Sequence, residues 1–257
     1  MIASIIFIII IGIFIKLYLD KQKRNLSFLM PANSRQILTD NVAFYRNLEP
    51  DKKLVFENRI EDFLKHVSIT GVGITVEDID RILIASGAII VIFAFEGWKY
   101  NNISEVLVYK DAFNEEFKSE GNSRNIIGMV GDGALQRQMI LSQPSVRSSF
   151  QHPNNGHNTV IHEFVHLLDK ADSAVDGVPE YLLARPYILP WIKNIHQTIQ
   201  EMKHSHHSDI NNYATTNDAE FFAVISEYFF EKPDQLKSHH PELYSILEQI
   251  FQNSINH

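Results

Sequence analysis

Hydrophobic periodicity divides most of the chain into helices. Apolar residues recur about every 3.6 positions over residues 35–48 and 51–66, which is the period of an amphipathic helix. Residues 187–203 and 241–252 are also predicted to be helical. Three short apolar and β-branched runs predict strands instead, and they are Ile69–Gly73, Glu105–Tyr109 and Gln138–Ser142. We therefore expect an α+β fold that is predominantly helical.

The most apolar internal segment is Glu77–Ala94, which becomes apolar from Ile82 onward. Its length of about 18 residues would suffice for a membrane span. However, Asp78, Asp80 and Arg81 occupy its first turns. We expect a helix that is buried in the core of the domain.

The first 25 residues carry a second apolar run, which predicts a membrane anchor. Ile2–Ile15 is interrupted in polarity only by Ser4, and with the residues up to Leu19 it reaches about 18 residues, enough to cross a bilayer. No positive charge precedes the run, as one would in a cleaved signal peptide. Positive charges follow it, at Lys16, Lys21, Lys23 and Arg24. The positive-inside rule then places the rest of the chain in the cytoplasm.

This pattern predicts three parts of the chain. Residues 1–25 form the anchor and its basic flank, residues 26–34 form a linker, and residues 35–257 form one folded domain. The alternative for the first part is a buried or amphipathic helix, in which case the protein is cytoplasmic and has no anchor.

His162, Glu163, Phe164, Val165 and His166 form an HExxH sequence. Two histidines four residues apart project from one face of a helix, so both imidazoles can bind one Zn²⁺. The glutamate beside them can accept a proton from a water on that ion. Apolar residues flank the motif, which predicts a buried helix whose polar groups need partners. The spacing indicates a zinc hydrolase with one ion per chain, and a buried helix without metal is the alternative.

A catalytic zinc site needs a third protein ligand and an open position for water. Asp172 stands six residues after His166, a spacing that some zinc sites use, but Asp169 occupies the position where those sites have a helix-breaking glycine. Glu220 and Glu227 lie seven residues apart in an apolar segment and would share one helical face. A buried carboxylate there needs a counter-charge. All three acidic residues are candidates.

Composition narrows the functional classes. A net charge of −8 argues against an extended nucleic-acid interface. The absence of cysteine excludes disulfides and thiolate zinc sites, and it fits a reducing compartment. Of the 12 histidines, two groups lie outside the motif, namely His204, His206 and His207, and His239 and His240. We expect these to be surface histidines rather than a second metal site.

Several blocks of the chain resemble the Mlc titration factor A family of zinc peptidases. The segment HEFVHLLD around the motif and the later segment NDAEFFAVISEYFF carry the resemblance. Further matching blocks are Ile69–Gly73, Asp80–Ser86, Val106–Phe113, Met139–Ser142, Asp176–Pro179 and Tyr213–Ala214. The similarity covers residues 45–253.

The resemblance implies a zincin-like metallopeptidase fold, related to the lethal-factor-like gluzincins, with a small sheet beside the HExxH helix. Matched block to block, it implies that His162, His166 and Glu220 bind the zinc ion. It also implies that Glu163 is the general base and that Tyr213, seven residues before the glutamate ligand, stabilises the transition state.

We therefore predict a zinc-dependent peptidase that acts on a peptide or protein substrate. In zincins an edge strand beside the motif helix pairs with extended substrate, and we expect Gln138–Ser142 to have this role. The resemblance implies a transcriptional regulator as a further partner, because the family binds the Mlc glucose repressor. The alternative function is a protein that sequesters a transcriptional repressor and has weak or vestigial peptidase activity.

Overall fold

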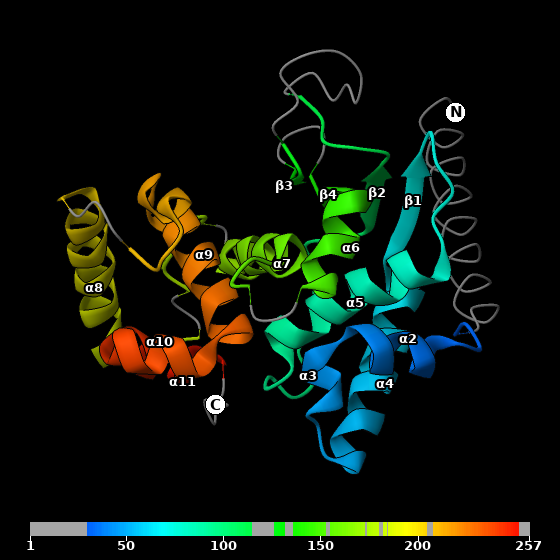
Figure 1. The fold of residues 1–257 in the computed structure, drawn as a ribbon, viewed down its shortest axis with the longest axis horizontal. Coiled ribbons are helices and arrows are strands. Elements are labelled where there is room, and N and C mark those ends of the chain that lie inside the picture. The colour runs from blue at the N-terminus through cyan, green and yellow to red at the C-terminus, as the bar shows by residue number, and fades with distance from the viewer. Residues whose placement is uncertain are drawn as a thin grey trace, which may run out of the picture.

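The computed structural model describes most of the chain between residues 30 and 251 (Figure 1). The residues it describes are 30–114, 126–131, 136–152, 155–172, 174–179, 182–183, 185–204 and 208–251. The predicted anchor, residues 1–25, lies outside them and stays a prediction. Among the helices that are described, none combines the length and the apolar character that crossing a bilayer requires.

Three helices open the described part of the domain. α2 (Ser34–Asn41) and α3 (Ala43–Arg46) replace the single helix predicted over residues 35–48. They are separated by Val42, a fully buried β-branched residue whose backbone is extended, with φ −104° and ψ 98°. α4 (Pro50–His66) agrees with the prediction over residues 51–66, and its proline stands in the first turn, where a missing N–H costs no helical hydrogen bond.

The strands form one mixed four-stranded sheet in the order β1-β2-β4-β3. The three predicted strands are present and run parallel to one another, as β1 (Ser68–Val72), β2 (Glu105–Tyr109) and β4 (Gln138–Ser142). A fourth strand, β3 (Gly128–Val130), runs antiparallel to β4. Because β4 has a partner on each side, the prediction that Gln138–Ser142 is an edge strand is wrong. In the described part of the sheet that edge is β3, whose three residues are too few to show a hydrophobic period.

α5 (Asp78–Ile92) connects β1 to β2 and is buried along most of its length, as its apolar sequence predicts. Glu77 and Asp80 start the helix with a capping box, in which each side chain accepts a hydrogen bond from the other residue's backbone N–H. The Asp80 carboxylate is fully buried, and Arg147 donates to it over 2.8 Å. This ion pair joins the start of α5 to the helix that follows β4.

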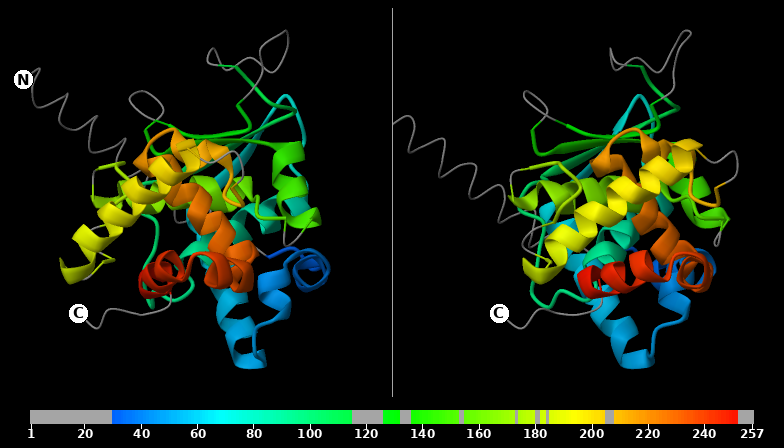
Figure 2. Two further views of the ribbon diagram at one scale, coloured as in Figure 1. Left: turned by 60° about the vertical axis from the view of Figure 1, so that its left-hand side comes forward. Right: turned by 90° about the vertical axis from the view of Figure 1, so that its left-hand side faces the viewer.

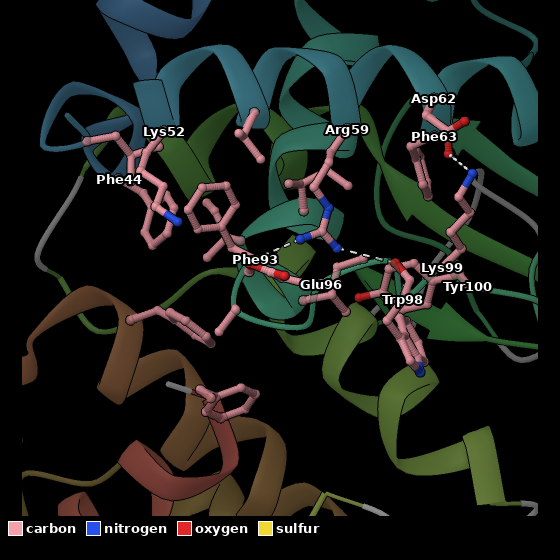
Figure 3. Close-up of a pocket in the computed structure, with 18 of the residues that line it drawn as sticks. Phe44, Lys52, Arg59, Asp62, Phe63, Phe93, Glu96, Trp98, Lys99 and Tyr100 are labelled. Atoms are coloured by element: carbon pink, nitrogen blue, oxygen red, sulfur yellow. Dashed lines mark hydrogen bonds and ion pairs between the residues drawn. The ribbon is translucent and has the colours of Figure 1, made fainter. Parts of the chain in front are cut away.

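A cavity of about 1800 Å³ lies between α4, the end of α5 and the C-terminal helices (Figure 3). Phe44, Phe93 and Trp98 are among the aromatic residues that line it. Arg59 reaches into the cavity and donates to the carbonyl oxygens of Phe93, at 2.8 Å, and Trp98, at 3.3 Å (Figure 3). Phe93 is the C-cap of α5, so Arg59 has a structural role, because a cation complements the C-terminal end of a helix.

The rest of the domain is helical. Its helices are α6 (Gln143–Gln151), α7 (Thr159–Asp169), α8 (Arg185–His204), α9 (Asp218–Glu231), α10 (Pro233–His239) and α11 (Pro241–Phe251). α8 and α11 agree with the helices predicted over residues 187–203 and 241–252. Short 3₁₀ turns cover Lys170–Asp172 and Asn212–Thr215.

α7 occupies the middle of the molecule (Figures 1 and 2). It packs against α5 on one side and α9 on the other, and it also contacts β3. One continuous hydrophobic core runs from the N-terminal helices through α5 and α7 to α11. The fold is therefore α+β and predominantly helical, as predicted, with the HExxH helix between the sheet and the C-terminal helices.

Candidate metal centre

α7 presents the polar residues of the HExxH sequence on one face. Asn158 caps the helix, since its side chain accepts a hydrogen bond from the Ile161 N–H at 3.0 Å. The apolar residues of α7, including Phe164, are buried and fix its rotation. His162 and His166 therefore stand one turn apart on the same side, with 4.8 Å between their ring centroids.

Three ligand atoms converge on one point between α7 and α9. Glu220 Oε2 lies 3.0 Å from His162 Nε2 and 3.4 Å from His166 Nε2, and the two Nε2 atoms are 3.1 Å apart. Tetrahedral zinc with bonds of about 2.0–2.1 Å separates its ligand atoms by about 3.3 Å. The triangle therefore fits a zinc ion in size and in donor type. Among the described residues, this is the one group of histidine and acidic side chains that is compact enough to hold a metal.

Glu227 supports the same site from the far side of an imidazole ring. Its Oε1 atom lies 2.7 Å from His162 Nδ1, and its Oε2 atom accepts the Asn158 N–H at 2.6 Å. A carboxylate that accepts a hydrogen bond from the Nδ1–H group keeps the proton on Nδ1, so that Nε2 is free to bind a metal. Of the three candidates for the third ligand, Glu220 is the one at the Nε2 atoms. The side chain of Asp172 lies outside the described part of the structure.

α9 holds both glutamates in place. Glu220 and Glu227 are seven residues apart, close to two helical turns, and share one face. The Asn217 side chain caps α9 by accepting the Glu220 N–H at 2.9 Å. Phe221 and Phe222, the two residues that follow Glu220, are fully buried. They fix the helix backbone against the core.

His162 and Glu220 stabilise each other's charged forms. Burial alone lowers the pKa of His162, but hydrogen bonds to Glu220 and Glu227 outweigh it and raise that pKa above its ordinary value. Burial raises the pKa of Glu220, but hydrogen bonds to His162 and His166 outweigh this and lower it to about 2. The site thus favours positive charge at its centre, and a divalent cation there would replace the proton of the imidazole.

Glu163 lies against the edge strand. Its side chain is buried, and a Cβ atom added at Gly128 of β3 would stand 2.5 Å from Glu163 Oε1. Burial raises the pKa of Glu163, although His162 and His166 act in the opposite direction. Gly128 is absent from the predicted site. A glycine within a strand is the signal for such a close approach, but one glycine in an unpredicted strand is a weak signal.

Tyr213 stands on the 3₁₀ turn at the open side of the site. Its ring centroid is 6.0 Å from that of His162, and the residue is 52% exposed. Its backbone N–H donates to Asn211 Oδ1 at 3.0 Å. Burial and then the nearby carboxylates, Glu220 first, raise the pKa of Tyr213, so the hydroxyl keeps its proton at neutral pH. The structure thus brings all five predicted site residues together.

Gly177 is a further residue that shapes the site from a distance. It has a positive φ of 77°, and a Cβ atom there would lie 2.3 Å from the carbonyl oxygen of Asp218, the first residue of α9. Its N–H donates to Asp169 Oδ2 at 2.9 Å, and its carbonyl accepts the Trp191 indole N–H at 2.7 Å. This close packing joins the end of α7 to the start of α9.

The other histidine groups, as far as the structure describes them, take no part in this centre. His239 Nδ1 and His240 Nε2 lie 2.7 and 2.9 Å from the carboxylate of Asp209, each at a different oxygen. His204 is exposed, and its Nδ1 lies 2.7 Å from the Gln200 carbonyl oxygen. His206 and His207 lie outside the described residues.

A buried helix with two histidines, a glutamate beside them and a third ligand from a later helix is the arrangement of the metallopeptidase class. The profile of the family described as glucose-regulated metallo-peptidase M90 matches residues 18–252. The chain belongs to this family of metallopeptidases.

The chain is also similar in sequence to individual proteins. An uncharacterised protein of Synechocystis sp. is 29% identical over 234 residues, which cover 86% of this chain and 84% of that protein. Mlc titration factor A of Pectobacterium atrosepticum is 30% identical over 164 residues, covering 57% of this chain and 58% of the relative. Mlc titration factor A of Edwardsiella ictaluri is 27% identical, and 60% of this chain and 62% of the relative are covered. The chain thus spans less than two thirds of these two titration factors.

Proposed function

We propose that this chain is a zinc-dependent peptidase with a zincin-like fold, in which His162, His166 and Glu220 hold one zinc ion. The main support is the convergence of the three ligand atoms, which lie 3.0 to 3.4 Å from one another. Two imidazoles and one carboxylate are a donor set of catalytic zinc sites, which keep a fourth position open. Zinc held there supplies a Lewis acid and lowers the pKa of a water molecule towards neutrality.

Glu163 and Tyr213 are the proposed catalytic residues. Glu163 takes the proton from the water that attacks the scissile carbonyl, and it then delivers this proton to the leaving amine. Burial, which raises the pKa of its carboxyl group, increases its basicity. Tyr213 keeps its hydroxyl proton and donates a hydrogen bond to the carbonyl oxygen as negative charge develops there.

We assign substrate binding to β3 in place of β4. Within the described residues β3 pairs with β4 alone, so its other side can accept an added strand. β3 also contacts α7, and at Gly128 it runs so close to Glu163 that an added Cβ atom would stand 2.5 Å from the carboxylate oxygen. An extended peptide paired along this edge would pass beside the general base.

Sequestration of a transcriptional regulator is the second candidate function. It is favoured by relatives that are named Mlc titration factor A. A protein that only sequesters a partner has no need of a buried glutamate beside a metal centre, which is why we rank peptide hydrolysis first.

We also propose that the peptidase domain, residues 35–257, is attached to the cytoplasmic face of a membrane by residues 1–25 through a linker, residues 26–34. A cytoplasmic protein without an anchor is the alternative.

The proposal is tested by measuring the turnover of a peptide library by the full chain and by its Glu163→Gln variant. Bound zinc is counted in both proteins. We expect about one zinc ion per chain in each protein, and a loss of turnover of about 10²–10⁴-fold in the variant. Glu61→Gln is the control and should keep full activity, because Glu61 is a partly exposed residue of α4 that pairs with Lys65 away from the site.

The outcomes separate the two candidate functions. Bound zinc with equally negligible turnover in the wild type and in Glu163→Gln would favour sequestration over hydrolysis. A wild-type chain that binds no zinc would overturn the metal centre itself.

A further inference from the structure

Asp209 lies outside the metal centre and joins three elements. Its Oδ2 atom accepts the Tyr228 hydroxyl at 2.6 Å and is 2.7 Å from His239 Nδ1, while its Oδ1 atom is 2.9 Å from His240 Nε2. Tyr228 belongs to α9, His239 ends α10, and His240 precedes α11. We call these four residues the Asp209 cluster. The carboxylate fastens the segment before α9 to the C-terminal helices.

The chemistry of Asp209 indicates a tight attachment. Burial raises the pKa of its carboxyl group, but hydrogen bonds from Tyr228, His240 and His239 outweigh this and hold the pKa well below its ordinary range. Tyr228 is itself buried and stands next to Glu227 in α9. Asp209 is therefore bound to the helix that also carries the glutamates of the metal centre.

Tyr213 follows Asp209 by four residues, and the intervening segment is fixed. Ile210 is buried, and its N–H donates to the Ser208 hydroxyl at 3.1 Å. The Asn211 side chain accepts the Tyr213 N–H at 3.0 Å, which starts the 3₁₀ turn. The Tyr213 ring is half exposed, so packing alone does not hold it over the site. Its side chain interacts with Glu220, and this backbone segment sets where the ring begins.

We propose that Asp209 is a positioning residue for Tyr213, acting through its hydrogen bonds to Tyr228, His239 and His240. The role depends on the proposed peptidase function. Because Tyr213 is proposed to act in the transition state, Asp209→Asn should lower kcat while leaving KM and zinc content nearly unchanged. A residue that only stabilised the fold would instead lower the amount of active protein without changing kcat per zinc-loaded chain.

A double-mutant cycle on the full chain tests the connection between the two residues. We expect Asp209→Asn to lower kcat about tenfold in the wild-type background and less than about twofold in the Tyr213→Phe background. Asp62→Asn is the matched control. The Asp62 carboxylate also pairs with a cation, Lys99, and lies near a histidine, His66, but it stands on α4 away from the site. Equal loss of kcat in both backgrounds would overturn the proposal.

Amide hydrogen exchange provides a readout that needs no activity. Asp209→Asn should raise exchange in residues 210–216 and leave α7 unchanged. Unchanged exchange in residues 210–216 would overturn the proposal whatever the kinetics show. If Asp209→Asn does not fold, Tyr228→Phe removes one hydrogen bond of the same cluster and takes its place. If Glu163→Gln abolishes turnover but Tyr213→Phe does not change it, this inference fails while the peptidase function stands.

Discussion

Within the described residues, two places bring a pair of histidines to one carboxylate, and one of the two has the geometry of a metal site. In the metal centre, His162 and His166 are four residues apart on α7, and both Nε2 atoms lie within 3.4 Å of the same Glu220 oxygen. In the Asp209 cluster the two histidines are adjacent in sequence, and each binds a different oxygen of Asp209.

The difference shows that the spacing of two histidines, rather than the composition of a cluster, decides whether its geometry can hold one metal ion. Side chains four residues apart on a helix point the same way, whereas adjacent side chains diverge. The ring centroids are accordingly 4.8 Å apart for His162 and His166 but 6.4 Å apart for His239 and His240. Burial follows the same division, since the side chain of His166 is 12% exposed and that of His239 is 50% exposed. A surface cluster of this kind serves to join helices.

Removal of the carboxylate from each cluster should give the largest contrast. Glu220→Ala removes one of the three proposed metal ligands, so we expect bound zinc to fall from about one ion per chain to less than about 0.1 after dialysis. Asp209→Ala should leave the zinc content unchanged. Elemental analysis of the two purified variants makes the comparison. Equal zinc loss in both would mean that the Asp209 cluster holds metal as well.

Tyr213→Phe should produce the next largest effect. Loss of one hydrogen-bond donor to a developing oxyanion lowers kcat by about 10²-fold. The zinc content should not change, because the Tyr213 hydroxyl is not among the three ligand atoms. Steady-state kinetics with zinc counted on the same sample provides the measurement. An unchanged kcat would exclude Tyr213 from the reaction.

Glu227→Gln tests the outer support of the metal centre and should have a smaller effect than Glu220→Ala. A group that orients a ligand histidine typically changes metal affinity by about 10–100-fold. We therefore expect zinc to bind with lower affinity but still at one ion per chain when it is supplied in excess. A competition titration with a chelator measures the affinity. The assignment of the third ligand is wrong if Glu227→Ala loses zinc entirely while Glu220→Ala keeps it.

The smallest predicted effect concerns the pH dependence of stability in the Asp209 cluster. The pKa of Asp209 is lower in the folded chain than the ordinary value of about 3.9. Its contribution, on the order of 1 kcal/mol, is therefore present above that ordinary value and is lost as pH falls towards the folded pKa. The difference in free energy of unfolding between wild type and Asp209→Asn should shrink between pH 5 and pH 2. Denaturant titrations across this range would contradict us if the difference grew.

Much of the fold follows from hydrophobic periodicity, and the exceptions have local causes. α4, α8 and α11 agree closely with the predicted ranges, α5 agrees because it is apolar along most of its length, and three strands agree within one residue because short apolar and β-branched runs mark them. Val42 divides the first predicted helix through its extended backbone, which no periodicity shows. β3 has three residues, so its place at the edge of the sheet depends on tertiary pairing with β4.

The residues of the candidate site also fall into those that the sequence predicts and those that only tertiary packing reveals. His162, Glu163 and His166 follow from local spacing, since a helix alone determines where they point. The sequence by itself leaves Glu220 and Glu227 equivalent on one helical face, and the packing of α9 against α7 separates them. Gly128 and Asp209 act through contacts between elements distant in sequence, which a single sequence does not reveal.

The most direct test of the metal centre is anomalous diffraction at the zinc absorption edge, on crystals of the full chain grown with zinc. We expect one strong peak, about 2.0–2.2 Å from His162 Nε2, His166 Nε2 and Glu220 Oε2. A strong peak between His239, His240 and Asp209, or no peak at the HExxH helix, would contradict the assignment.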